Sequence, residues 1–174
     1  EGSTIYHKTE YRERRDHYAF FTVNAPLDGF DTSRDAFLGA YRSNADPEVA
    51  ENGQCTGSVA HGWAPVGVHQ INVTLQPGEK KSLIFVLGYI ENAGDEKWAA
   101  PGVINKKKAY AMQERYKTDA QVDAALAALH EHWNKLLSTY TVKSSDEKLD
   151  RMVNIWNQYQ CMVTFNMSRS ASYY

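Results

Sequence analysis

The sequence has little of what marks secreted, membrane-spanning or nucleic-acid-binding proteins. It contains only two cysteines, Cys55 and Cys161, and neither has a partner at metal-binding spacing. No apolar run approaches the roughly 20 residues that a membrane helix requires, and no secretory signal opens the sequence. Lys plus Arg 19 against Asp plus Glu 21 gives a net charge of -2, which disfavours nucleic acid and anionic membranes as partners. We therefore expect free thiols, a cytoplasmic location and no bound metal.

What is present is enough apolar material for a folded core, 43% of 174 residues. The first half predicts strands. Residues 18–23 form an aromatic and β-branched run, and residues 71–75 alternate apolar with polar side chains. Pro77 and Gly78 then suit a type II turn, and the apolar run 83–87 follows, so we expect a β-hairpin. The stretch 39–68 is rich in Gly, Asn, Ser and Pro and is predicted as long loops with a short helical turn.

The second half predicts helices. Residues 104–116 favour a first helix, whose lysines 106–108 are expected to form a solvated face. Thr118 and Gln121 form a capping box before an apolar stripe that reaches Leu136. A second capping box at 144–147 opens a helix through Val163, so Trp133 and Trp156 are expected in a core. The succession from sheet to helices indicates two domains joined by a helical link.

The last stretch, 156–174, begins as an amphipathic helix and ends on hydroxyls and aromatic rings around Arg169. Chain termini usually lie at a solvated surface, whereas arginine is suited to planar recognition of phosphate or carboxylate. The chain also opens on Glu1 without a methionine. We therefore expect that the chain is an interior piece of a longer protein.

With these residues laid out, the sequence resembles the cellobiose phosphorylases, inverting phosphorylases of glycoside hydrolase family 94. The resemblance is carried by five stretches: residues 5–11, 29–35, 75–79, 85–89 and 146–172. It implies a multidomain α and β protein with three parts. These are the C-terminal portion of a galactose-mutarotase-like β-sandwich (1–92), a helical linker (93–143) and the first helix of an (α/α)6 catalytic barrel (144–174).

The resemblance also implies the reaction, in which cellobiose and phosphate give α-glucose 1-phosphate and glucose without a metal or organic cofactor. Because phosphate is the nucleophile, the enzyme needs one carboxylic acid and a cationic phosphate site. By family analogy we predict that Arg169 contacts phosphate; the alternative is a structural ion pair with a carboxylate at a helix end. No catalytic residue is found in this chain. The general acid is expected after Tyr174, so the fragment alone should be inactive.

For several other polar and aromatic residues, the sequence allows either a functional role or a purely structural one. Asp16, Asp31 and Asp35 are expected to be turn or surface carboxylates, because their spacing makes no catalytic pair. The histidines 7, 17, 61 and 69 share no metal-ligand spacing. Trp63 and the pair 41–42 suit either a sugar platform or an interface, and packing is favoured. The remaining weak candidates, for a subunit contact or the active-site rim, are Tyr6, His7 and the 30–34 loop.

The favoured hypothesis is part of a homodimeric cellobiose phosphorylase that acts on a disaccharide and phosphate. A noncatalytic carbohydrate-binding or scaffolding module is the alternative from another class. A sister phosphorylase that acts on chitobiose or on longer cellodextrins is a third hypothesis.

Overall fold

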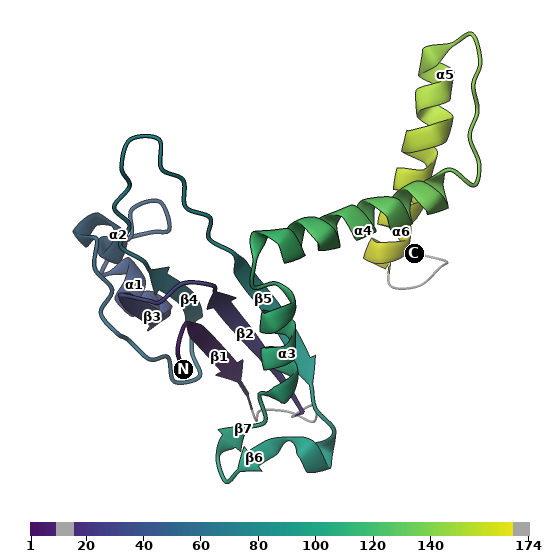
Figure 1. Cartoon of the computed structure of the whole chain (residues 1–174). Coiled ribbons are helices and arrows are strands. Elements are labelled where there is room, and N and C mark those ends of the chain that lie inside the picture. The colour runs from purple at the N-terminus through teal and green to yellow at the C-terminus, as the bar shows by residue number, and fades with distance from the viewer. Residues whose placement is uncertain (10–15, 169–174) are drawn as a thin grey trace. The chain divides into compact units, whose positions relative to one another are not determined.

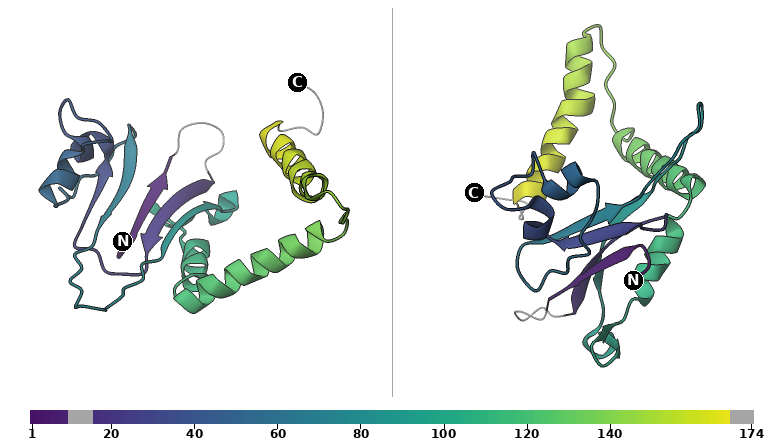
Figure 2. Two further views of the ribbon diagram at one scale, coloured as in Figure 1. Left: turned by 90° about the horizontal axis from the view of Figure 1, so that it is seen from above. Right: turned by 90° about the vertical axis from the view of Figure 1, so that its left-hand side faces the viewer.

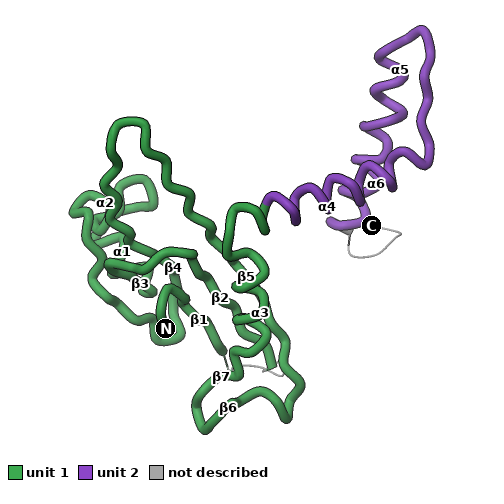
Figure 3. Tube along the Cα trace, viewed as in Figure 1, with its two compact units in different colours: residues 1–122 green, residues 123–174 purple. Residues whose placement is uncertain are grey.

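The computed structural model describes residues 1–9 and 16–168 (Figure 1). The chain divides into two compact units, residues 1–122 and 123–174 (Figure 3). Each unit is described by itself.

The first unit carries the strands in three small antiparallel sheets. A three-stranded sheet has the order β1-β2-β5, β3 pairs with β4, and β6 pairs with β7. The strands are β1 (Thr4–Lys8), β2 (His17–Val23), β3 (Gly29–Ser33), β4 (Pro65–Gln70), β5 (Phe85–Glu91), β6 (Trp98–Ala100) and β7 (Val103–Ile104).

Short helices connect these strands, and longer ones follow. The helices that lie within the first unit are α1 (Arg34–Leu38), α2 (Glu48–Asn52), the 3₁₀ turn η1 (Gly94–Glu96) and α3 (Lys107–Arg115). Helix α4 (Asp119–Leu137) begins in the first unit and continues into the second. The second unit then contains α5 (Glu147–Arg151), the π-helical turn η2 (Met152–Trp156) and α6 (Asn157–Ser168).

The core of the first unit lies between the three-stranded sheet and α3, which covers one face of it (Figures 1 and 2). Strand alternation sends Tyr18, Phe20 and Ile90 to this face, where they meet Ala109 of α3. All four are at least 95% buried. Burying each large side chain stabilises the fold by about 1.5–3 kcal/mol.

The opposite face of the same sheet packs against β4. The ring of Phe21 stacks on His69 of β4 at 4.4 Å between centroids, and on Phe85 at 5.9 Å. Gly67 makes this approach possible, because a Cβ there would lie 3.0 Å from the Phe21 ring. The aromatic stack therefore joins the β3–β4 pair to the three-stranded sheet.

The strand prediction for 18–23 is confirmed by β2, but the predicted hairpin is wrong. The turn exists: Gly78 has φ 84° and the Glu79 amide donates to the Gln76 carbonyl at 2.9 Å. Residues 71–75 are not a strand, and the second arm becomes one only at Phe85, where β5 begins; β4 and β5 belong to different sheets. A type II turn splays its flanking arms, because its twist does not match that of paired strands.

The predicted loop 39–68 contains the short helix α2, as expected, but its last residues belong to β4. Val66 and Val68 alternate with Gly67 and His69, which was the available signal. This strand was not predicted because the Gly and Pro content of the preceding stretch favoured a loop.

Of the two predicted capping boxes, one is confirmed and one is wrong. The capping box at α4 is confirmed, since the Gln121 amide donates to Thr118 Oγ1 at 3.4 Å and the Thr118 amide donates to Gln121 Oε1 at 2.9 Å. The second box is wrong: the N-cap of α5 is Asp146, whose carboxylate accepts from the amides of residues 148 and 149. Asp146 replaces Ser144 because one carboxylate oxygen serves two amides.

Candidate functional site

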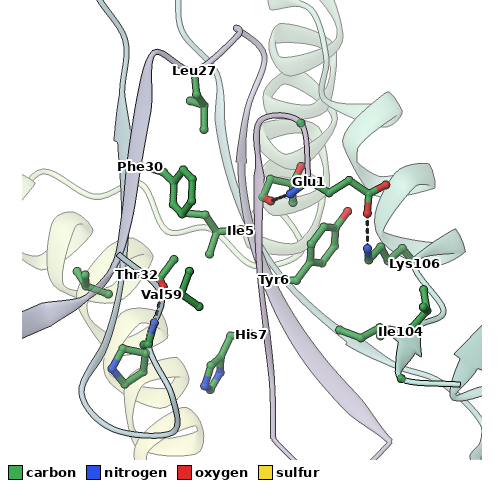
Figure 4. Close-up of a pocket in the computed structure, with 17 residues that line it drawn as sticks. Glu1, Ile5, Tyr6, His7, Leu27, Phe30, Thr32, Val59, Ile104 and Lys106 are labelled. Atoms are coloured by element: carbon green, nitrogen blue, oxygen red, sulfur yellow. Dashed lines mark hydrogen bonds and ion pairs between the residues drawn. The ribbon is translucent and has the colours of Figure 1, made fainter. Parts of the chain in front are cut away.

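A cavity of about 480 Å³ lies along β1, which is an edge strand of its sheet. Figure 4 shows side chains surrounding it from β1, from β3 and from the segments before α3. It brings together the weak candidates that the sequence analysis named from separate stretches: Tyr6, His7, and Phe30 and Thr32 of the 30–34 segment. That segment is not a loop as predicted, because residues 30–33 belong to β3 and Arg34 begins α1. These candidates therefore line one pocket, and their role at a subunit contact or at an active-site rim stays a prediction.

The wall of this cavity is mainly apolar. Strand alternation puts Ile5 and His7 on the face of β1 that looks toward β3, while Tyr6 lies on the α3 side. Phe30 and Val59 are 38% and 59% exposed. An apolar pocket with a few polar groups is the usual form of a binding site.

One rim of the cavity is charged. Lys106 forms an ion pair with the side chain of Glu1 and lies over the Tyr6 ring, 4.8 Å from its centroid. Tyr110 donates to Glu1 at 3.0 Å, and this hydrogen bond raises the pKa of Tyr110 to about 12. The hydrogen bond from Lys106 holds the pKa of Glu1 below its ordinary value. The predicted solvated lysine face is therefore wrong for Lys106, whose side chain is only 18% exposed.

A buried carboxylate shapes the opposite rim. Asp31 is fully buried and accepts hydrogen bonds from the amides of Thr56 at 3.0 Å and Ser58 at 2.9 Å. The two hydroxyls donate to it at 2.5 and 2.6 Å. Burial alone would raise the pKa of Asp31, but these hydrogen bonds outweigh burial and lower its pKa to about 2.

The expectation that Asp31 is a turn or surface carboxylate is therefore wrong. It fixes the loop that carries Val59 and Ala60 to the cavity, aided by Thr32, whose hydroxyl accepts from the Ala60 amide at 2.8 Å. Asp16 and Asp35 are exposed, as expected. Burial, together with Asp31, raises the pKa of Cys55 to about 11, so this free thiol is unreactive.

The four histidines named from the sequence lie in different surroundings. His7 lines the cavity, His17 stacks on Tyr89 at 5.5 Å, His61 is exposed and His69 belongs to the aromatic stack. Burial lowers the pKa of His69. Within residues 1–9 and 16–168, no group of three or more His, Cys, Asp or Glu side chains is placed to hold a metal ion.

The aromatic candidates lie on the surface of the described chain. Trp63 is 81% exposed and Tyr41 is fully exposed, while Arg42 forms an ion pair with Glu51. Whether either ring contacts a sugar or another protein surface stays a prediction.

The second unit carries its own groove, of about 1,090 Å³, lined by Trp133, Val153, Phe165 and their neighbours. Trp133 and Trp156 are 37% and 52% exposed, so the expectation that both are core residues is wrong for this chain. Their apolar stripes are real, but the described helices of this unit leave much of them uncovered. Arg169 lies outside the described residues. No described helix has the length and apolar content to cross a bilayer.

The fold and pocket define a sheet-rich, sandwich-type module with aromatic packing between its sheets, followed by a helical segment. Residues 1–119 match the family model "Glycosyl hydrolase 94, supersandwich domain", and residues 132–174 match "Glycosyl hydrolase 94 superfamily, catalytic domain". The chain belongs to glycosyl hydrolase family 94, which confirms the family predicted from the sequence.

Three curated relatives are phosphorylases. The chain is 31% identical to the N,N'-diacetylchitobiose phosphorylase of Vibrio furnissii over 90% of its residues, and 34% identical to that of Vibrio proteolyticus over 84%. It is 25% identical to the 3-O-beta-D-glucopyranosyl-beta-D-glucuronide phosphorylase of Paenibacillus borealis over 85%. The matched segment spans 18%, 16% and 17% of these relatives.

Proposed function

We propose that this chain is part of an inverting disaccharide phosphorylase. The observation that supports this most is the order of the two family matches, supersandwich domain and then catalytic domain. Two phosphorylases that align with 90% and 84% of the chain support it further. In this proposal the complete protein uses phosphate to split a β-linked disaccharide. The products are an α-sugar 1-phosphate and a free sugar.

The disaccharide is the finer part of the proposal. The sequence stretches 5–11 and 146–172 resemble cellobiose phosphorylases, which supports cellobiose. Two relatives are named for N,N'-diacetylchitobiose, which supports this sugar as the alternative. The two substrates differ at C2, where a hydroxyl or an acetamido group requires different polar partners, and a mismatched buried polar group is costly.

The chemistry follows from the nucleophile. Phosphate attacks the anomeric carbon on the face opposite the leaving sugar, while a carboxylic acid protonates the leaving oxygen. We propose that Arg169 contacts phosphate, that the acid lies elsewhere in the complete protein, and that no metal or organic cofactor takes part. Residues 144–174 would begin an (α/α)6 barrel. The complete protein would be a cytoplasmic homodimer; the two free cysteines of this chain agree with a reducing compartment.

Under this proposal the described cavity has no catalytic role. The one carboxylate among its described lining residues, Glu1, is paired with Lys106 and accepts a hydrogen bond from Tyr110, and its lowered pKa disfavours the protonated form that a general acid requires. The 174-residue chain by itself should therefore not convert a disaccharide.

The test is a phosphate-dependent assay of the complete gene product with cellobiose, N,N'-diacetylchitobiose and 3-O-β-D-glucopyranosyl-β-D-glucuronide. Release of a sugar 1-phosphate from one of these sugars supports the proposal and identifies the substrate. Sugar release that is independent of phosphate would reject it.

A further inference from the structure

Residues 71–75 continue β4 in sequence beyond the end of its partner strand. The last β3–β4 pair is Gly29 with Gln70, and the Asp28 amide still donates to the Gln70 carbonyl at 2.9 Å. The Asn72 amide then donates to the Asp28 carboxylate at 2.6 Å. Beyond Asn72 the chain no longer pairs with β3.

The segment has a strand sequence but no strand partner. Ile71, Val73 and Leu75 alternate with polar residues, and Val73 and Leu75 are 40% and 49% exposed. Among the described residues, none forms a hydrogen bond with the backbone of residues 73–75. A period-2 apolar pattern normally indicates one buried face of a sheet, so its exposure here is unexplained by the first unit alone.

The direction of the free edge follows from the hydrogen bonds. In a strand, alternate residues direct their amide and carbonyl groups to the same side. Since Gln70 and Asn72 direct theirs toward β3, a continued strand would direct the amides of residues 71, 73 and 75 to the opposite side. That side is the free edge of β4, because β3 is its one partner strand within residues 1–9 and 16–168.

We propose that residues 71–75 are a strand extension of β4 that pairs with a strand from another part of the same polypeptide. Two observations select this occupant. The aromatic stack covers one face of the β3–β4 pair but leaves the outer edge of β4 without a partner strand among the described residues. The family match is to a supersandwich domain, while the matched segment spans only 16–18% of the three relatives. The inference rests on the proposed function insofar as both require a longer polypeptide.

The splayed turn at Pro77 and Gly78 agrees with this arrangement. It prevents the two arms from pairing with each other, so each arm extends a different strand. The second arm reaches β5, where Asn24 and Ile84 exchange two hydrogen bonds: the Asn24 amide donates to the Ile84 carbonyl at 3.2 Å, and the Ile84 amide donates to Asn24 Oδ1 at 2.8 Å.

The test is residue-resolved hydrogen exchange on the complete gene product. The amides of residues 71, 73 and 75 should exchange at least 100-fold more slowly than the amide of Asn44 in its exposed loop, with β2 as the protected reference. Exchange of all three as fast as the loop would overturn the proposal.

A pair of variants adds a second readout. Val73→Pro removes the amide that the ladder requires, and Val73→Ala removes a similar side chain but keeps the amide. The Tm of the proline variant should lie several degrees below that of the alanine variant; equal Tm values would overturn the proposal. A phosphorylase assay on the same wild-type sample separates the two claims, since protected amides without activity would reject only the proposed function.

Discussion

Asp31 and Ser58 are joined twice: the carboxylate of Asp31 accepts from the Ser58 amide at 2.9 Å and from its hydroxyl at 2.6 Å. With the matching pair from Thr56, every donor at this site points at one fully buried carboxylate. A charge is tolerated there because its hydrogen bonds replace those of water. The Asp31 carboxylate is therefore the main charged anchor of the loop beside the cavity, with Thr32 as a second, uncharged one.

Replacing this acceptor should destabilise the protein. Asp31→Asn places an NH₂ group among four donors and removes the charge, so the free energy of unfolding should fall by about 2–4 kcal/mol. Asp35→Asn, on the exposed first turn of α1, is the matched control and should change it by less than about 0.5–1 kcal/mol. Chemical denaturation measures both, and equal losses would contradict this account of Asp31.

The low pKa of Asp31 predicts a pH dependence at acid pH. Because the folded-state pKa is about 2 and the ordinary value is 3.8, the carboxylate contributes full stability above about pH 4. About 2 kcal/mol should be lost as the pH falls from 4 to below 2. Denaturation midpoints measured across this range should show a smaller acid loss in Asp31→Asn than in wild type. An unchanged slope would show that Asp31 is not the responsible group.

Gly88 lies opposite Phe20 in the β2–β5 register, and a Cβ at this position would overlap the Phe20 ring. Gly88→Ala should therefore cost about 1–3 kcal/mol through overpacking of the core. Gly94→Ala is the control, because its Cβ would meet nothing within 4 Å. Thermal unfolding should give a lower Tm for the first variant only. A neutral Gly88→Ala would mean that this core is looser than described.

The stability of the contact between the β3–β4 pair and the three-stranded sheet should fall with pH, because His69 lies in the aromatic stack that joins them. Burial lowers its folded-state pKa, so the unfolded state takes up the proton first, near pH 6.5. Stability should therefore decrease as the pH drops through 6.5 toward the lower folded-state pKa. His69→Phe keeps a ring stacked on Phe21 and removes the titration, so its Tm should vary less between pH 7 and 5. A variant with the wild-type slope would place the effect elsewhere.

Arg169 can be tested in the complete protein. Arg169→Ala should raise the KM for phosphate at least 10-fold, with a much smaller change for the disaccharide, if the guanidinium contacts phosphate. Arg151→Ala, an exposed residue of α5, is the control and should leave both KM values near those of wild type. A larger effect on the disaccharide KM would remove the assignment of Arg169 to phosphate.

Local sequence signals predicted local structure well. The aromatic and β-branched run at 18–23 predicted β2, and Thr118 with Gln121 predicted the start of α4. These succeed because their physical causes lie within a few residues. The hairpin at 71–87 failed because the turn type matters as much as the strand pattern.

The candidate site could be predicted only in part. Asp31 meets Thr56 and Ser58 across 25 and 27 residues of chain, so no local pattern distinguished it from an exposed turn residue. The pocket likewise brings β1 and β3 together only through the tertiary fold. Resemblance to known sequences supplied the family, which neither periodicity nor composition indicates.

Phosphorus and proton NMR of the complete gene product, mixed with phosphate and each of the three disaccharides, tests the central claim most directly. The account predicts an α-sugar 1-phosphate that accumulates in equal amount to the free sugar, with phosphate consumed one for one. Two free sugars with no consumption of phosphate would contradict it.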